Sequence, residues 1–382
     1  MKIGYLDRVW SDGLAGWCPE SWVLVSINGK PCCTLHCQDQ RLDVQAAGHS
    51  EDGLVGFQAP VQFASGDIVR VTTLQGIPLH NSPWLYLAPQ SQNWLPAALA
   101  DTHPEYAAIA ALKSELNFDH FRPLLGQVGQ VVATVLATHD QPERVVRLNT
   151  DYREAADLTR FHLLVLTPAA ISCPALHKTL NIDGRLVQIF DYCTGVTLDQ
   201  YGPGWECWIP RVIEELKRLQ DAGEEQRKTL GRRSHKGTLL RKQLLGGLSD
   251  GLRSPRAPGE RRFLLWLLTT LWRLPRVLSH GDLHRNNVLV DAKRDTIALI
   301  DWDRWGYLPV GFDLARLLRG VPGERVEMLV GGDWQQRLGV LGFTYLLQRL
   351  DRPGFASSAE GEELRQRCLT LARHAGNQET SK

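Results

Sequence analysis

The sequence has no long hydrophobic run and no excess of charge of one sign. No apolar stretch approaches the ~18–20 residues that a membrane-spanning helix requires. The 43 Lys and Arg residues are balanced by 42 Asp and Glu residues, whereas a general nucleic-acid-binding protein carries a broad basic excess. We therefore expect no membrane span and no nucleic acid as a partner.

The N-terminus, M-K-I-G-Y-L-D-R-V-W, also lacks the apolar segment of a secretory signal. Eight cysteines in 382 residues, without such a signal, are typical of reduced thiols in a cytoplasm. Hydrophobic residues make up 43% and charged residues 22%, as in ordinary globular proteins. Since domains have ~100–200 residues, the sequence predicts a folded cytoplasmic protein of more than one domain.

About the first 80 residues show no helical periodicity and are interrupted by glycine. Val23, Val25 and Ile27 alternate with other residues and lead into Asn28-Gly29. Alternation that ends in Asn-Gly is the strongest short-range signal of a β-hairpin. We predict a small, sandwich-like all-β domain over residues 1–88.

This region contains four short segments of interest: G-W-C at 16–18, V-L-V-S-I-N-G-K-P at 23–31, R-L-D-V at 41–44 and G-F at 56–57. They resemble a β module that accompanies bacterial glycosyltransferases and other surface-glycan enzymes. The resemblance covers about residues 12–72 and implies no catalytic residues.

The rest of the chain is predicted to contain a linker and helix over 89–117, a mixed part over 118–197 and a mainly helical part over 198–382. In the mixed part, apolar patterning predicts strands at 131–136, 145–148 and 186–190, and an amphipathic helix at 153–166. In the helical part, a hairpin-like pair of strands lies at 287–290 and 296–300.

The segment S-H-G-D-L-H-R-N-N-V-L at 279–289 contains Asp282 and, after four intervening residues, Asn287. Protein kinases have this spacing in their catalytic loop, where the Asp accepts the proton of the attacking hydroxyl and the Asn holds Mg²⁺. A phosphoryl group in transit spreads negative charge over its oxygens, so such a site must position an alcohol and supply a divalent cation. The predicted hairpin would fold Asp301 back beside the loop, where its carboxylate would be the second metal ligand.

Three motifs, H-G-D-L-H-x-x-N-V-L at 280–289, I-D-W-D at 300–303 and G-F-D-L-A at 311–315, resemble those of the aminoglycoside phosphotransferase and choline kinase family. The resemblance covers about residues 118–375. It implies an α+β, bilobal protein-kinase-like fold after the β domain. The nucleotide-binding N-lobe would span 118–197, and the mainly helical C-lobe at 198–382 would carry the catalytic loop and the acceptor site.

The resemblance also implies roles for individual residues. Asp282 is the catalytic base, and Asn287 and Asp301 are the Mg²⁺ ligands. The supporting residues are His280 as a buried brace of the loop, Asp303 on the metal or acceptor side, and Asp313 as a structural anchor of the lobe. His and Asp at a turn commonly satisfy only backbone groups, so the combination of the three motifs is what indicates the site.

The nucleotide-binding residues are predicted in the N-lobe. Gly126 and Gly129, in G-Q-V-G, either cover the phosphates through backbone N–H groups or form an ordinary turn. Arg147 stands on its strand where kinases place the Lys that clamps the phosphates; the alternative is a surface strand residue. Glu154, in the E-x-x-x-L pattern of the next helix, is the predicted ion-pair partner of Arg147, with Asp157 as the alternative.

The segment D-Y-C-T-G at 191–195 follows the strand at 186–190 and looks like the hinge of the family. There the backbone N–H and C=O groups would bind adenine, so Asp191 and Cys193 are predicted to contribute through their main chain.

Residues 227–262 contain 11 Lys or Arg residues against Asp250 and Glu260, and the apolar segment 263–272 follows. One interpretation is a basic flap over an anionic acceptor, such as a phosphorylated or carboxylated glycan, or a patch that contacts an anionic membrane surface. The other is a solvated loop followed by a buried helix, since the apolar segment is too short to span a bilayer.

A cluster of Cys32, Cys33, His36 and Cys37, with Cys18 upstream, contains the residue types that bind zinc. Zinc fingers usually place their ligands in two separated pairs. Here one cluster lies on a predicted strand, whose neighbouring residues face opposite ways. Half-buried thiols are therefore the favoured interpretation.

Together these features predict a phosphotransferase that uses ATP and Mg²⁺ to phosphorylate a hydroxyl of a small molecule, and the β module favours a sugar or envelope-glycan intermediate. A protein kinase is disfavoured because no A-P-E-like segment follows Asp301 and H-G-D replaces H-R-D. The short glycine loop and Arg147 are arguments for a non-catalytic nucleotide-binding scaffold. The presence of all three residues, Asp282, Asn287 and Asp301, is the stronger argument against it.

Overall fold

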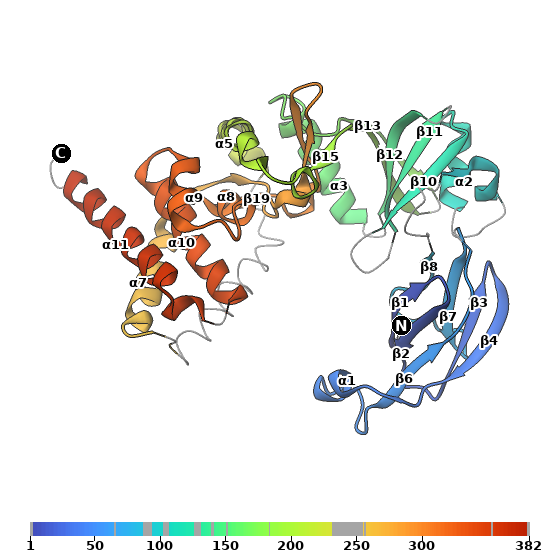
Figure 1. Ribbon diagram of the computed structural model, residues 1–382. Coiled ribbons are helices and arrows are strands. Elements are labelled where there is room, and N and C mark those ends of the chain that lie inside the picture. Colours follow the sequence, from blue (N-terminus) through green and yellow to red (C-terminus); the bar gives the residue numbers. More distant parts are fainter. Residues whose placement is uncertain are drawn as a thin grey trace. The chain divides into compact units, whose positions relative to one another are not determined.

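The computed structural model describes residues 3–64, 66–86, 94–101, 107–125, 131–138, 141–149, 152–182, 184–230, 255, 257–352 and 354–379. The chain divides into two compact units, Met1–Ala155 with Leu176–Tyr192, and Ala156–Ala175 with Cys193–Lys382. Figure 1 labels those of their helices and strands for which there is room. Within the described residues, no helix is both long and apolar enough to cross a membrane.

The first unit begins with a sandwich of two antiparallel sheets, ordered β1-β2-β6-β5 and β4-β3-β7-β8. The elements are β1 (Tyr5–Trp10), β2 (Gly13–Trp17), β3 (Trp22–Ile27), β4 (Lys30–His36), β5 (Asp39–Gln40), α1 (Leu42–Ala46), β6 (Leu54–Ala59), β7 (Ile68–Thr73) and β8 (Trp84–Leu85). Both sheets contribute to one core, which includes Leu6, Leu14, Val23, Phe57 and Val71. The prediction of an all-β N-terminal region is confirmed.

The β3–β4 hairpin turns at the predicted Asn-Gly pair. Asn28 and Gly29 have positive φ angles of 52° and 77°, as a type I′ turn requires. The Asn28 side chain donates a hydrogen bond to Asp67 (2.7 Å) and accepts one from the Ile68 backbone N–H (2.9 Å). The turn residue therefore also ties the hairpin to the neighbouring strand β7.

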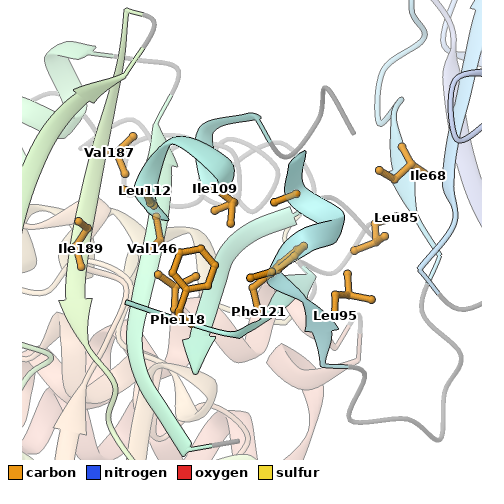
Figure 2. Packing of buried hydrophobic residues seen from close by; sticks show 13 residues of the cluster. Ile68, Leu85, Leu95, Ile109, Leu112, Phe118, Phe121, Val146, Val187 and Ile189 are labelled. Atoms are coloured by element: carbon orange, nitrogen blue, oxygen red, sulfur yellow. The ribbon is translucent and has the colours of Figure 1, made fainter. Parts of the chain in front are cut away.

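The first unit continues with a six-stranded antiparallel sheet, ordered β13-β14-β12-β11-β10-β9. Its elements are β9 (Leu95–Pro96), η1 (Ala97–Asp101), α2 (Ala107–Ala111), η3 (Leu112–Ser114), β10 (His120–Leu125), β11 (Val131–Thr138), β12 (Gln141–Asn149), β13 (Leu176–Ile182) and β14 (Arg185–Asp191). Phe121, Val146 and Ile189 pack in its core (Figure 2). Ile68 and Leu85 of the sandwich belong to the same cluster, so the two parts of this unit share buried surface.

Helix α3 (Tyr152–Phe161) follows β12 and continues as a π-helical segment, His162–Leu166. The sequence predicts a single amphipathic helix here, and the change to wider π turns was not predicted. Such turns are frequently found at functional sites. The segment packs against α5 (Ile209–Leu230), with His162 and Val165 buried.

The second unit is mainly helical and contains two small antiparallel sheets. One is ordered β15-β17-β18, with β15 (Val196–Thr197), β17 (Val288–Asp291) and β18 (Thr296–Leu299); the other pairs β16 (Arg276–Ser279) with β19 (Gly306–Pro309). The helices besides α5 are α4 (Leu198–Tyr201), η5 (Trp205–Trp208), α7 (Glu260–Arg273), η6 (Arg285–Asn287), η7 (Trp302–Arg304), α8 (Phe312–Leu317), α9 (Gly323–Val330), α10 (Trp334–Asp351), η8 (Phe355–Ser357) and α11 (Ala359–Glu379).

Helix α10 is the centre of the second unit. Every residue from 338 to 349 is buried, and α7, α8, α9 and α11 all contact it. At its buried end, the Arg349 guanidinium pairs with the Glu260 carboxylate at 2.6 Å. The helical framework around α10 thus holds α8, which in turn contacts the loop that contains Asp282.

Candidate active site

Asp282 lies in the loop between β16 and β17. The pairing of β16 with β19 places Ser279 opposite Gly306, which brings the start of this loop beside the segment 301–305. Gly281 has a φ of +82°, and a Cβ at this position would lie 2.0 Å from the carbonyl oxygen of Arg304. Only glycine permits so close an approach, so the glycine of the H-G-D motif is required by the contact between the two segments.

The backbone of the loop is held by Asp313 of α8. Its carboxylate accepts hydrogen bonds from the backbone N–H groups of His280 (2.7 Å) and Gly281 (2.9 Å). Burial raises the pKa of Asp313, against the opposing effects of His280 and of these hydrogen bonds. A buried carboxylate of the second unit thus bonds two consecutive N–H groups of the loop.

His280 is buried and bonded at both ring nitrogens. Nε2 lies 2.8 Å from the carbonyl oxygen of Ile300, which can only accept, so Nε2 carries the proton. Nδ1 then accepts a hydrogen bond from the backbone N–H of Asp282 at 3.4 Å. Burial lowers the pKa of His280, in keeping with a neutral ring that joins the loop to the end of β18.

The carboxylate of Asp282 is held by two arginines that the sequence analysis did not identify. Oδ2 lies 3.1 Å from Nε of Arg304, and Oδ1 accepts a hydrogen bond from Nη2 of Arg316. The Asp282 side chain keeps 16% of its surface exposed. Arg316 follows Asp313 by three residues on α8, a spacing that places both on one helix face, and this spacing is the signal that could have indicated it.

Asn287 and Asp301 come together through the β17–β18 hairpin. The register pairs Val288 with Leu299, and the Asn287 carbonyl accepts a hydrogen bond from the Ile300 N–H at 3.0 Å. The Asn287 Nδ2 donates to the Asp282 carbonyl at 2.9 Å, which leaves Oδ1 as its oxygen donor for a cation. Asp301 has a φ of +64° and stands at the N-cap position of η7, without a side-chain capping hydrogen bond. Carboxylate and amide oxygens are the ligand types that suit Mg²⁺.

His284 is a further residue of this loop that the sequence analysis did not single out. Burial lowers its pKa, while the charges of Asp282 and Asp301 raise it and that of Arg316 lowers it. One imidazole thus lies within electrostatic reach of both predicted functional carboxylates. Asp303, the predicted metal- or acceptor-side residue, lies in η7 directly after Trp302.

The predicted nucleotide-binding residues belong mainly to the first unit. Arg147 lies on β12 opposite Gln188, and Glu154 lies in the first turn of α3. Asp191 is the last residue of β14, and its carboxylate pairs with Arg144 at 2.8 Å. Cys193 belongs to the second unit, as the first residue of the segment Cys193–Lys382. The ion pair between Arg147 and Glu154, with Asp157 as the alternative partner, stays a prediction.

Two sequence predictions fall largely outside the described residues. Gly126 and Gly129 lie outside them, and of the basic segment 227–262 only 227–230, 255 and 257–262 are described. Among the described side chains, no three His, Cys, Asp or Glu residues are grouped to hold a metal. In the predicted cysteine cluster, Cys37 is buried, Cys33 is half-buried and Cys32 is exposed.

The family model of the phosphotransferase enzyme family, APH, matches residues 120–347. This match spans more than half of the chain and includes the loop and hairpin described above. The chain therefore belongs to the phosphotransferase enzyme family, and the predicted family and α+β, protein-kinase-like fold are confirmed. No curated protein matches the chain significantly.

Solved phosphotransferase structures also resemble it. Spectinomycin phosphotransferase APH(9)-Ia, in complex with ADP and spectinomycin, is 13% identical over 70% of this chain and 92% of its own, with a TM-score of 0.45. The macrolide 2′-phosphotransferase MphH from Brachybacterium faecium is 16% identical over 68% and 96%, with a TM-score of 0.44. APH(3″)-Id from Streptomyces rimosus, in complex with ADP and streptomycin, is 16% identical over 63% and 97%, with a TM-score of 0.41.

Proposed function

We propose that the protein is an ATP- and Mg²⁺-dependent phosphotransferase that phosphorylates a hydroxyl group of a small molecule. The observation that carries this proposal is the joining of Asp282, Asn287 and Asp301 through one loop and hairpin of the second unit. The side-chain amide of Asn287 donates a hydrogen bond to the backbone carbonyl of Asp282. The backbone carbonyl of Asn287 accepts one from the N–H of Ile300, the residue before Asp301. This local framework supports the proposed roles of Asp282 as the base and of Asn287 and Asp301 as oxygen ligands for a cation.

In the proposed reaction, the Asp282 carboxylate orients the acceptor hydroxyl and takes its proton. The acceptor oxygen forms a bond to the γ-phosphorus as the bond from that phosphorus to the β,γ-bridging oxygen breaks, and ADP leaves. Mg²⁺, when held by Asn287 and Asp301, would neutralise the negative charge of the phosphates. His280 and Asp313 hold the loop so that the carboxylate does not move during transfer.

The proposal is tested by measuring ADP release from MgATP with a panel of hydroxyl compounds, for wild type and Asp282→Asn. The amide keeps the shape of the side chain but cannot take the proton, so transfer should fall by ~10²–10⁴-fold. Binding of ATP should remain close to that of wild type. A variant that keeps more than about a tenth of the rate would contradict the role of Asp282.

Within this reaction class, we propose a sugar or envelope-glycan intermediate as the acceptor. The support is the resemblance of the N-terminal β domain to modules of surface-glycan enzymes. The hydroxyl panel should therefore contain sugars and sugar phosphates beside aminoglycosides and choline. If only the last two stimulate ADP release, the acceptor proposal is wrong while the phosphotransferase proposal stands.

A further inference from the structure

The carboxylate of Asp282 is contacted by two arginines, whose side chains differ in their exposure to solvent. Arg304 comes from the segment after Asp301, and its side chain keeps 35% of its surface exposed. Arg316 comes from α8, and its side chain keeps only 10% exposed. An exposed arginine can move away when a substrate arrives, whereas a buried one is confined by its packing. Arg316 is therefore the fixed contact of the two.

Helix α8 holds both the backbone and the side chain of the catalytic loop. Asp313 accepts the N–H groups of His280 and Gly281, and Arg316, one turn later, donates to Asp282 Oδ1. All six residues of α8 are buried, and the guanidinium of Arg316 lies 5.9 Å from the ring centroid of Phe312. The helix thus presents a carboxylate and a guanidinium to the loop in a fixed relation.

The contact determines which way the carboxylate can face. The terminal torsion of an aspartate side chain is soft and populates a broad range of angles, so the backbone alone does not fix the direction of the two oxygens. An ionised carboxylate has about four lone-pair sites. One N–H from Arg316 fixes the direction of Oδ1 and still leaves lone pairs for an acceptor hydroxyl.

We propose that Arg316 is a positioning residue for phosphoryl transfer, which holds the Asp282 carboxylate in the orientation that receives the acceptor hydroxyl. This inference rests on the proposed function, since it gives Asp282 the role of base. It predicts that loss of the guanidinium slows the chemical step and leaves nucleotide binding unchanged, because the hydrogen bond of Arg316 is made to the carboxylate of the proposed base.

The test compares Arg316→Gln, Arg316→Lys and Arg316→Ala with wild type in ADP release from MgATP, with water or the best hydroxyl compound of the panel as acceptor. Arg319→Gln is the matched control, since Arg319 follows three residues later and pairs with Asp351 with 49% of its side chain exposed. We expect kcat of Arg316→Gln to fall ~10²-fold, as for a misplaced catalytic group. KM for MgATP should stay within about twofold.

Two readouts separate positioning from a merely structural role. Arg316→Lys, which keeps a cation, should retain more activity than Arg316→Gln, and added guanidinium ion should raise kcat of Arg316→Ala. Thermal unfolding tests whether each variant is folded. If Arg316→Gln is not folded, kcat of Arg316→Lys is compared with that of wild type instead. Unchanged kcat, an increase in KM alone, a loss shared by Arg319→Gln, or no recovery with guanidinium would overturn the inference.

Failure of the proposed function gives a different result. If wild type releases no ADP with any acceptor, the proposed function is wrong. If Asp282→Asn is as active as wild type, the phosphotransferase proposal stands but Asp282 is not the base. If Asp282→Asn is inactive while all Arg316 variants have wild-type kcat, only the positioning role is wrong.

Discussion

The ring of Phe161 lies flat against the ring of Trp305, with centroids 4.1 Å apart and an angle of 6° between the planes. Phe161 is the last residue of α3, and Trp305 follows η7. Phe161 also meets Trp302 at 5.8 Å, and Trp302 meets His280 at 4.4 Å. A continuous set of rings therefore links the end of α3 to the Asp301 segment and to the catalytic loop.

Phe161→Ala should destabilise the protein strongly, because Phe161 is completely buried and its ring fills the space between α3 and the two tryptophans. Truncation of a buried Phe to Ala typically costs ~3–5 kcal/mol of unfolding free energy. The measurement is chemical denaturation. Leu163→Ala is the control, since Leu163 lies two residues later with 61% of its surface exposed, and it should change stability by less than ~0.5 kcal/mol. Equal effects of the two changes would contradict the packing described here.

Asp301→Asn should weaken the response to Mg²⁺, because the variant loses a charged oxygen ligand while Asn still tolerates the positive φ angle. Stabilisation by ADP is measured by thermal unfolding with Mg²⁺ and with a chelator. We expect wild type to gain extra stability from Mg²⁺ and Asp301→Asn to lose most of that gain. A tenfold loss of metal affinity corresponds to ~1.4 kcal/mol.

The control for this measurement lies at the other end of the same hairpin. Asp295 also has a positive φ, 55°, and pairs with Arg211 at the surface. Asp295→Asn should keep the Mg²⁺-dependent gain. If Asp301→Asn keeps it too, Asp301 is not a metal ligand.

Acidification should destabilise the protein in part through His280. Burial holds the folded-state pKa of His280 below its ordinary value of 6.5, so the unfolded chain binds the proton more readily and stability falls as pH drops below about 6.5. His280→Gln cannot titrate. The cost of this substitution, measured by denaturation at pH 7.5 and pH 5.5, should therefore be smaller at pH 5.5.

The comparison between the two proteins removes the effect of groups on which His280 has no printed influence, such as His284, whose pKa is also lowered. Asp313 is different, because His280 itself lowers the pKa of that carboxyl. A cost that is equal at both pH values would show that His280 is not held neutral by its surroundings.

The parts of the site that the sequence predicted are local in the chain. Asp282, Asn287 and Asp301 lie on one loop and one hairpin, and their spacing follows from strand pairing. The Asn28-Gly29 turn was also predictable from a short segment, because a turn with two positive φ angles favours these residue types. The family motifs indicated His280 and Asp313 as supporting residues.

The contacts that the sequence did not predict join distant segments. Arg316 reaches Asp282 across 34 positions. The three-residue spacing from Asp313 places Arg316 on the same helix face, but it does not specify Asp282 as its partner. The π-helical end of α3 was missed because apolar spacing near 3.6 residues fits an α-helix equally well. Contacts of this kind depend on the assembled core, which residue patterns along the chain do not encode.

Arg349→Met should be among the most destabilising single changes outside the catalytic loop. The Arg349 and Glu260 side chains form an ion pair at 2.6 Å, with 1% and 0% of their surfaces exposed. Removal of one partner leaves a buried charge without compensation, which typically costs ~3–5 kcal/mol. The double variant Arg349→Met/Glu260→Gln should recover part of this loss, because no charge then remains buried. Arg352→Met, which breaks the more exposed pair with Glu360, is the control and should cost at most ~1 kcal/mol.

The measurement is chemical denaturation of wild type, Arg349→Met, the double variant and Arg352→Met. A double variant that is less stable than Arg349→Met would mean that the uncompensated charge is not the source of the cost.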